Sequence, residues 1–183
     1  KGTACRVVVV PNAVELPEEH AATPDGTSDH TSPLVLLFVG RFAFNKGIDV
    51  LLAVAKRLVH EGHAGLVRFD LVGSGPLFSG IQAAGVPENV RLLGRLDDAA
   101  LAHRYADCDA FILPTRFEGM PTVVLEAMAQ AKPIFVSDVG ATTELVDRHN
   151  GYLLPPGNEK ELYNAVLSFC ELSPEVRTRM GRY

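Results

Sequence analysis

The sequence has few cysteines, no long apolar run and no surplus of positive charge, and each absence excludes a class of protein. Only three of the 183 residues are cysteine. They lie far apart in apolar segments, which is typical of buried, reduced thiols and not of a disulfide framework. No apolar run approaches the ~20 residues of a membrane-spanning helix, and the first residues do not resemble a signal peptide. We therefore expect a cytoplasmic protein.

The balance of charge argues against two classes of partner. Lys plus Arg number 17 and Asp plus Glu number 22, so the formal net charge is −5. Four of the acids lie between Pro17 and Pro33, a segment without Lys or Arg, and the rest of the chain is nearly neutral. A general nucleic-acid or anionic-membrane binder needs a basic face. We expect no nucleic-acid partner.

The apolar residues, 47% of the chain, are arranged as alternating strands and helices, which predicts an α/β fold with a Rossmann-like, doubly wound parallel sheet. Predicted strands cover 5–10, 34–39, 67–72, 90–93, 109–113 and 133–136. Predicted helices cover 48–62, a segment beginning at Asp97 or Asp98, 121–131 and 158–172. We divide the chain into a junction strand and loop (1–16), a polar loop or linker (17–33), the main domain (34–172) and the start of a truncated helix (173–183).

Glycine-rich loops follow the predicted strands. Glycine lets backbone approach a ligand closely, and in parallel sheets ligands bind at the carboxyl ends of the strands. The pattern predicts a nucleotide-type cleft lined by five loops, at 40–47, 73–76, 94–96, 114–121 and 137–140.

Two cations stand in the first of these loops. Arg41 and Lys46 follow a strand, and Gly47 opens the next helix. A guanidinium fork, an ammonium and a helix N-terminus together favour a diphosphate. An ordinary pair of surface charges is the alternative, and these residues alone leave both open.

A second group of polar residues surrounds the predicted helix that begins at Pro121. Glu126 is the only charged residue between Gly119 and Ala131, and it lies one turn from Thr122. A carboxylate on so apolar a helix needs a hydrogen-bonding partner. Together with Glu118 it suits a hydroxyl-rich ligand such as a sugar and a ribose. The alternative is a helix cap and a satisfied core acid.

In order along the chain, these segments resemble the C-terminal, donor-binding domain of GT-B fold retaining glycosyltransferases of family 4, also called group 1. The resemblance covers residues 6 to about 170, and the two glutamates reproduce the family's spacing. The matching segments are 11–14, 40–47, 72–76, 90–94, 114–119, 125–129 and 150–154.

The resemblance implies a role for each matching residue. Arg41 and Lys46 would hold the donor diphosphate and stabilise the departing leaving group. Glu118 would bind sugar hydroxyls, and these three residues form the expected catalytic group. The remaining donor-binding residues would be Glu126 for the ribose, Arg95 and Leu96 near the base, and the backbone of Gly73, Gly75, Gly119, Met120, Pro121, Thr122 and Val123.

The family's activity implies further expectations. The parent enzyme would transfer a sugar from a nucleotide-diphosphate sugar with retention, and without a cofactor or required metal. An acceptor-binding domain would precede this one, so the chain alone would bind donor without turnover. The full-length protein would associate peripherally with membrane. Met120-Pro121 replaces the family's usual aromatic-glycine pair, and the proline removes one backbone donor from the phosphate cradle.

Several other interpretations are open. A GT-B relative such as a sugar-nucleotide epimerase or phosphorylase, or a non-catalytic nucleotide-binding module, shares many of these features. A dinucleotide-binding dehydrogenase domain is disfavoured, because the glycine fingerprint after residue 72 is incomplete. Two motifs suggest metal sites, but we interpret Asp107-Cys108-Asp109 as structural and His60-Glu61-Gly62-His63 as a helix end.

Overall fold

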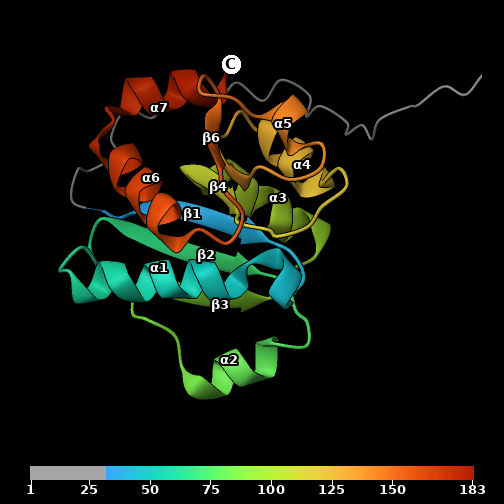
Figure 1. The fold of residues 1–183 in the computed structure, drawn as a ribbon, viewed down its shortest axis with the longest axis vertical. Helices are drawn as coiled ribbons and strands as arrows, with labels where there is room; N and C mark the ends of the chain where they lie inside the picture. Colours follow the sequence, from blue (N-terminus) through green and yellow to red (C-terminus); the bar gives the residue numbers. More distant parts are fainter. Residues whose placement is uncertain (1–31) are drawn as a thin grey trace, which may run out of the picture.

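A computed structural model describes residues 32–183, in which strands and helices alternate (Figure 1). The strands are β1 (Leu34–Val39), β2 (Val67–Val72), β3 (Val90–Gly94), β4 (Ala110–Leu113), β5 (Ile134–Ser137) and β6 (Gly151–Leu154). The helices are α1 (Ile48–His60), α2 (Phe78–Ala84), α3 (Asp98–Asp107), α4 (Thr122–Ala129), α5 (Thr142–Leu145), α6 (Glu159–Glu171) and α7 (Pro174–Gly181), with a 3-10 turn, η1, at Phe44–Lys46.

The six strands form one parallel sheet in the order β3-β2-β1-β4-β5-β6. The predicted α/β class and doubly wound parallel sheet are confirmed. Strand β1 pairs with β2 on one side and with β4 on the other, with Leu36 beside Ala110. The chain order therefore reverses between β1 and β4, and in open α/β sheets this switch point is where ligands bind.

Helices cover both faces of the sheet. Helices α1 and α6 pack against each other in front of the strands in Figure 1, while α3 and α4 lie behind them. Strands covered on both faces are expected to be continuously apolar, and every residue of β4 and β5 is buried. Six phenylalanines are fully buried in the core, namely Phe38, Phe42, Phe69, Phe111, Phe135 and Phe169.

The structure refines the predicted boundaries and adds elements that the pattern did not reveal. Helix α4 begins at Thr122, so Pro121 is its N-cap residue and not, as expected, its first helical residue. Asp97 is the cap of α3, and its carboxylate accepts a hydrogen bond from the Ala100 amide at 2.8 Å. Strand β6 and the short helices α2 and α5 were not predicted. The predicted strand at 5–10 and the segment 1–16 lie outside the described residues.

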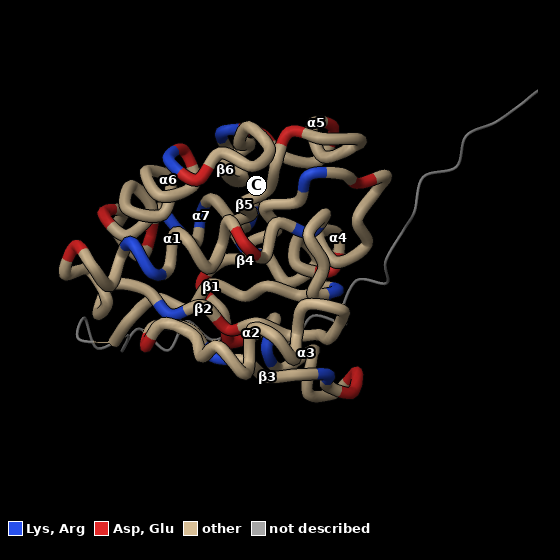
Figure 2. The backbone as a smooth tube through the Cα atoms, turned by 60° about the horizontal axis from the view of Figure 1, so that its bottom comes forward, with Lys and Arg blue, Asp and Glu red and all other residues tan. Residues whose placement is uncertain are grey.

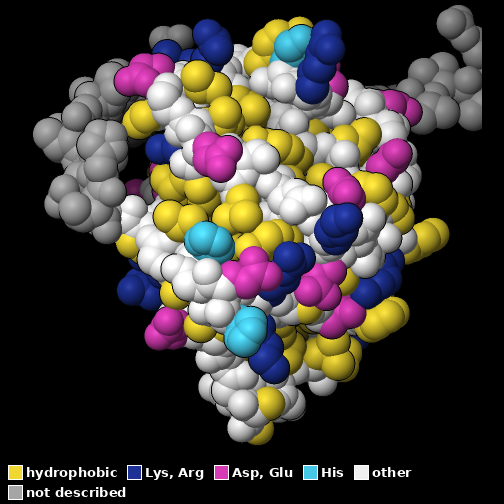
Figure 3. All heavy atoms as spheres, turned by 60° about the vertical axis from the view of Figure 1, so that its left-hand side comes forward, with side chains coloured by type: hydrophobic (Ala, Val, Ile, Leu, Met, Phe, Trp, Pro, Cys, Tyr) yellow, Lys and Arg dark blue, Asp and Glu magenta, His cyan; other side chains and the backbone are white. Residues whose placement is uncertain are grey.

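The surface mixes charges of both signs. Figure 2 shows basic and acidic residues interspersed along the tube, and the face in Figure 3 carries both signs among apolar side chains. Among residues 32–183 no helix combines the length and the apolar character needed to cross a bilayer.

Candidate functional site

The loops after β1 and β2 pack backbone against backbone at the carboxyl edge of the sheet. A Cβ on Gly73, where φ is +127°, would lie 1.9 Å from the Gly40 carbonyl oxygen. A Cβ on Gly75 would lie 2.6 Å from the Phe42 carbonyl oxygen. Both glycines are therefore explained by contact between loops, whether or not they also approach a ligand.

The loops after β1 and β4 are joined in the same way. Gly47 has a φ of +69°, and its Cβ would lie 1.8 Å from the Pro114 carbonyl oxygen. The Arg116 amide and the Thr115 hydroxyl both donate to the Asn45 carbonyl, at 2.7 and 2.8 Å. Thr115 is fully buried. The two loops thus form one rigid unit above the switch point.

Lys46 and Glu118 meet across this unit. The Lys46 ammonium donates to a carboxylate oxygen of Glu118, although the residues are 72 apart in sequence. Their side chains are 23% and 12% exposed, so the ion pair is only partly solvated. A partly buried pair is less screened by salt than a surface pair. The structure therefore brings together two of the three predicted catalytic residues, which were selected from separate motifs.

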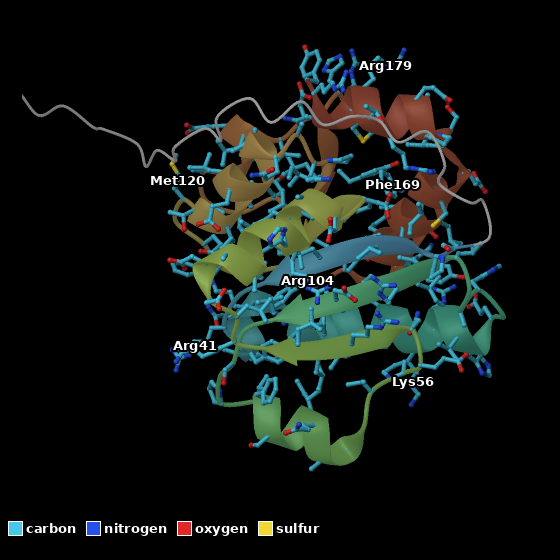
Figure 4. The ribbon with its side chains drawn as sticks, turned by 180° about the vertical axis from the view of Figure 1, so that it is seen from behind. Arg41, Lys56, Arg104, Met120, Phe169 and Arg179 are labelled. Atoms are coloured by element: carbon cyan, nitrogen blue, oxygen red, sulfur yellow. The ribbon has the colours of Figure 1, made fainter. Side chains whose placement is uncertain are left out.

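Arg41 lies on the same loop as Lys46 and is exposed. In Figure 4, Arg41 and Met120 lie at the same end of the sheet, while Lys56 lies at the opposite end. The Arg41 guanidinium is therefore solvated, whereas the Lys46 ammonium on the same loop is held by Glu118. That arrangement can attract an anion and then fix it.

The loop before α4 is open where the predicted phosphate cradle lies. Nothing lies within 4 Å of a Cβ built on Gly119, and Thr122 is exposed at the start of the helix. Pro121 is buried at the N-cap, and the Gly119 carbonyl accepts a hydrogen bond from the Ala141 amide at 2.9 Å. The loop is thus tied to the segment after β5 while its glycine faces open space.

Glu126 has the partner that its apolar helix requires. The hydroxyl of Tyr105, from α3, donates to the Glu126 carboxylate at 2.9 Å. Tyr105 is buried, and burial together with the Glu126 charge raises the pKa of its hydroxyl, so it remains a proton donor. A carboxylate can accept several hydrogen bonds, so this contact is compatible with a further ligand hydroxyl. It also satisfies the alternative of a stabilised helix acid.

The loop after β3 joins the same edge. The Gly94 carbonyl accepts a hydrogen bond from the Gly73 amide at 2.7 Å, and Gly94 has a φ of +67°. Arg95 is exposed and Leu96 is half-buried directly after it. The residues expected near the base therefore follow a loop that is fixed to the β2 loop.

The two metal-like motifs have structural roles. The Asp109 carboxylate accepts a hydrogen bond from the Val35 amide at 2.7 Å. His60 is the last residue of α1, and Glu61 pairs with Arg57 and accepts the Tyr163 hydroxyl. No group of three or more potential metal ligands occurs within residues 32–183.

Three residues that form hydrogen bonds around the candidate site were not identified from the sequence. No role was assigned from the sequence to Tyr105, Arg116 or Asp49. Arg116 is charged and follows a predicted strand, and Asp49 is charged and lies in the first turn of a predicted helix, which are the signals that could have marked them. Their pairing depends on the adjacency of β1 and β4, which the sequence pattern does not give.

Residues 33–171 match the family described as glycosyl transferases group 1. The chain belongs to this family. A glycosyltransferase of Methanocaldococcus jannaschii is 32% identical over 149 residues, which are 79% of this chain and 40% of that protein. The alpha-D-kanosaminyltransferase of Streptomyces kanamyceticus is 29% identical over 80% of this chain and 39% of its own. A glycogen synthase of Thermus thermophilus is 31% identical over 78% of this chain and 33% of its own.

Solved structures of glycosyltransferases with the GT-B fold share this architecture. Staphylococcus aureus TarM superposes with a TM-score of 0.74 at 19% identity, covering 95% of this chain and 34% of TarM. Sucrose-phosphate synthase of Thermosynechococcus elongatus gives 0.70 at 27% identity, covering 84% and 39%. Anabaena HepE, solved with UDP, gives 0.69 at 24% identity, covering 84% and 43%. The chain therefore spans between 33% and 43% of the length of these relatives.

Proposed function

We propose that this chain is the donor-binding domain of a retaining glycosyltransferase that uses a nucleotide-diphosphate sugar. The observation that carries the proposal is the meeting of Lys46 and Glu118 at the switch point between β1 and β4. An ammonium and a carboxylate at this position are suited to adjacent parts of one ligand, a diphosphate and a sugar. Relatives whose names denote glycosyl transfer, and a fold neighbour solved with UDP, support the same class of ligand.

The charged residues then bind different parts of the donor. Arg41 and Lys46 neutralise the diphosphate, on which negative charge accumulates as the sugar departs, and this electrostatic contribution favours the transition state. Glu118 accepts hydroxyls of the sugar and Glu126 those of the ribose, so both carboxylates position the donor. Amides at the start of α4, from Gly119 to Val123, face the phosphate or the sugar, and Arg95 and Leu96 flank the base.

The complete enzyme requires more than this domain. We propose that an acceptor-binding domain in the same protein supplies the second substrate, so that this chain binds donor without turning it over. We further propose that neither metal nor cofactor is required, that the transferred group is a hexose or a related sugar, and that the protein acts in the cytoplasm with peripheral attachment to membrane.

A thermal-shift panel of UDP, GDP and ADP at millimolar concentration tests the proposal. A ligand that binds only the folded state stabilises it by about 2.7 kcal/mol at a hundredfold excess over Kd. We expect one of the three to raise the Tm of the chain, and Lys46→Ala to reduce that rise. NADH in the same panel distinguishes a dinucleotide-binding domain. No rise with any of the three nucleoside diphosphates would contradict the proposal.

A further inference from the structure

We propose that Arg116 is a positioning residue of the donor site, which holds the Lys46 ammonium where the diphosphate binds. The inference rests on the proposed function, because it assigns a support to one of the residues of that site. Arg116 lies in the loop after β4, and Lys46 ends the turn η1 in the loop after β1. The two loops are brought together only by the pairing of β1 with β4.

The Arg116 guanidinium forms an ion pair with the first turn of α1. Its Nη1 and Nη2 atoms donate to the two carboxylate oxygens of Asp49, each at 2.7 Å. Parallel bidentate contacts of this kind fix the orientation of both groups. The hydrogen bonds from Arg116 hold the pKa of the Asp49 carboxyl below its ordinary value. Asp49 lies three residues after Lys46, so this ion pair fixes the chain just after the turn η1.

The same side chain also holds the beginning of the turn. Its Nη1 atom donates to the Phe44 carbonyl at 2.7 Å, and the guanidinium carbon lies 4.0 Å from the centroid of the Phe44 ring. Guanidinium groups stack on aromatic faces in this way. One side chain therefore contacts residues on both sides of Lys46, at Phe44 and at Asp49.

Backbone contacts complete the enclosure of the turn. The Arg116 amide and the Thr115 hydroxyl donate to the Asn45 carbonyl, the residue directly before Lys46. The Lys46 side chain then reaches Glu118, two residues beyond Arg116. Segment 115–118 thus holds the turn by Thr115 and Arg116 and receives the ammonium at Glu118.

The charge of Arg116 is matched by Asp49, so the pair adds little net attraction for an anion. This distinguishes Arg116 from Arg41, which is exposed on the same side of the sheet. The contribution of Arg116 to diphosphate binding must then pass through the placement of Lys46 and not through its own charge. Replacing Lys46 distinguishes these two routes, because an effect that passes through Lys46 disappears when Lys46 is absent.

A double-mutant cycle tests this route on the 183-residue chain. Affinities for whichever of UDP, GDP or ADP binds, and for the corresponding nucleoside, are measured by calorimetry in four proteins: the unmodified chain, Arg116→Ala, Lys46→Ala and the double variant. We expect Arg116→Ala to weaken diphosphate binding about 5- to 20-fold and to leave nucleoside binding unchanged. In the Lys46→Ala background the same change should have no further effect, because coupled residues are not additive.

Arg57 offers a matched control. Its guanidinium pairs with the Glu61 carboxylate at 2.7 Å and stacks 3.8 Å from the Tyr163 ring centroid, so it combines an ion pair with an aromatic contact, as Arg116 does, but away from the site. Arg57→Ala should leave both affinities unchanged. Arg116→Lys keeps the charge but loses the fork, so it should bind diphosphate about as weakly as Arg116→Ala. Asp49→Asn should show a smaller loss of the same kind, and it provides the test if Arg116→Ala does not fold.

The outcomes separate this inference from the proposed function. If the unmodified chain binds no nucleoside diphosphate, the proposed function fails and the inference fails with it. If it binds, the inference alone is overturned by unchanged diphosphate affinity in Arg116→Ala and Asp49→Asn, by an equal loss of nucleoside affinity, by full rescue in Arg116→Lys, or by a loss that persists without Lys46.

Discussion

Three charged residues of the candidate site, Lys46, Glu118 and Glu126, already have partners within the protein. Lys46 is paired with Glu118, and Glu126 accepts the Tyr105 hydroxyl. A diphosphate that approaches Lys46 must therefore compete with a carboxylate for the ammonium. A sugar hydroxyl that approaches Glu118 gains access as the ammonium turns to phosphate. The two parts of a nucleotide sugar are expected to assist each other's binding.

Glu118→Gln tests this competition. The neutral amide cannot hold Lys46 as an ion pair, and it provides only one acceptor oxygen where the carboxylate has two. We expect nucleoside-diphosphate affinity to stay level or rise by up to about 5-fold, and the additional affinity given by the sugar to fall about 10-fold, consistent with the energy of a hydrogen bond to a charged group.

The measurement is calorimetric titration with the nucleoside diphosphate and with its sugar conjugates. Glu144→Gln, at an exposed glutamate of α5, controls for loss of one negative charge. Equal weakening of both ligands would show that Glu118 does not act on the sugar.

Residue roles could be predicted only in part. The sequence shows that Glu126 needs a partner, because it is the only charged residue on a mostly apolar helix. It does not show that the partner is Tyr105, which is 21 residues earlier on a different helix. The chemistry of Glu126 shows that it needs a hydrogen bond, whereas only the packing of α3 against α4 shows that Tyr105 donates it.

At the scale of elements, the loops at the carboxyl edge depend on glycines that admit a neighbouring backbone. Gly47 both ends the turn that bears Lys46 and begins α1, in a left-handed conformation against Pro114. Any side chain there would push the β1 loop away from the β4 loop. The geometry of the ion pair therefore depends on a residue that has no side chain.

Gly47→Ala and Gly62→Ala separate two costs of adding a side chain, the strain of a positive φ and the clash with a neighbouring backbone. Both glycines have positive φ, at +69° and +82°, but a Cβ on Gly62 meets nothing within 4 Å. Gly62→Ala should reduce the free energy of unfolding by about 1 kcal/mol, the usual cost of the left-handed conformation. Gly47→Ala adds a clash with a backbone carbonyl and should cost about 3 kcal/mol or more. Chemical denaturation measures both, and equal losses would contradict the packing argument.

Elements with a continuous apolar run or a repeated apolar face were predicted, and three short elements without such a pattern were not. Strands β1 and β2 have the predicted bounds, and α1 and α6 are close to theirs, because a continuous run or a repeated apolar face specifies them. Strands β4 and β5 also have four residues each, but both are fully buried, largely apolar runs. Helix α5 and strand β6, with four residues each, are only partly buried and show no such run. Strand β6 is formed by pairing with β5, which is a tertiary contact.

At the scale of the whole molecule, the site is produced by strand order. Lys46 and Glu118 are 72 residues apart, and Arg116 and Asp49 are 67 apart. Both pairs exist because β1 and β4 are neighbours and their loops leave the same edge. The site thus joins the two halves of the sheet, β3-β2-β1 and β4-β5-β6.

The ion pair between Asp49 and Arg116 makes the free energy of unfolding depend on pH. Arg116 lowers the pKa of Asp49 in the folded state below its ordinary value of 3.8. A lowered pKa contributes stability that is present above the unfolded pKa and is lost as the pH falls through the folded pKa. The unmodified chain should therefore be more stable than Asp49→Asn at pH 5 to 7, and the difference should shrink below about pH 4.

Denaturant unfolding from pH 7 to pH 2.5 measures the difference. Asp98→Asn, at the exposed start of α3, serves as the control for a carboxyl away from this pair. A difference between Asp49→Asn and the unmodified chain that does not change with pH would show that the carboxylate charge is not what stabilises the contact.

The sequence by itself determined the fold class, and it predicted the edge of the sheet and the residue types of the candidate site. These follow from local facts, since apolar periodicity gives the elements and parallel strands place the loops after them at one edge. Only the tertiary structure decided that β1 lies beside β4, and hence that Lys46 faces Glu118 and that Arg116 holds the turn between them. Strand order is set by packing among residues distant in sequence, and no local pattern records it.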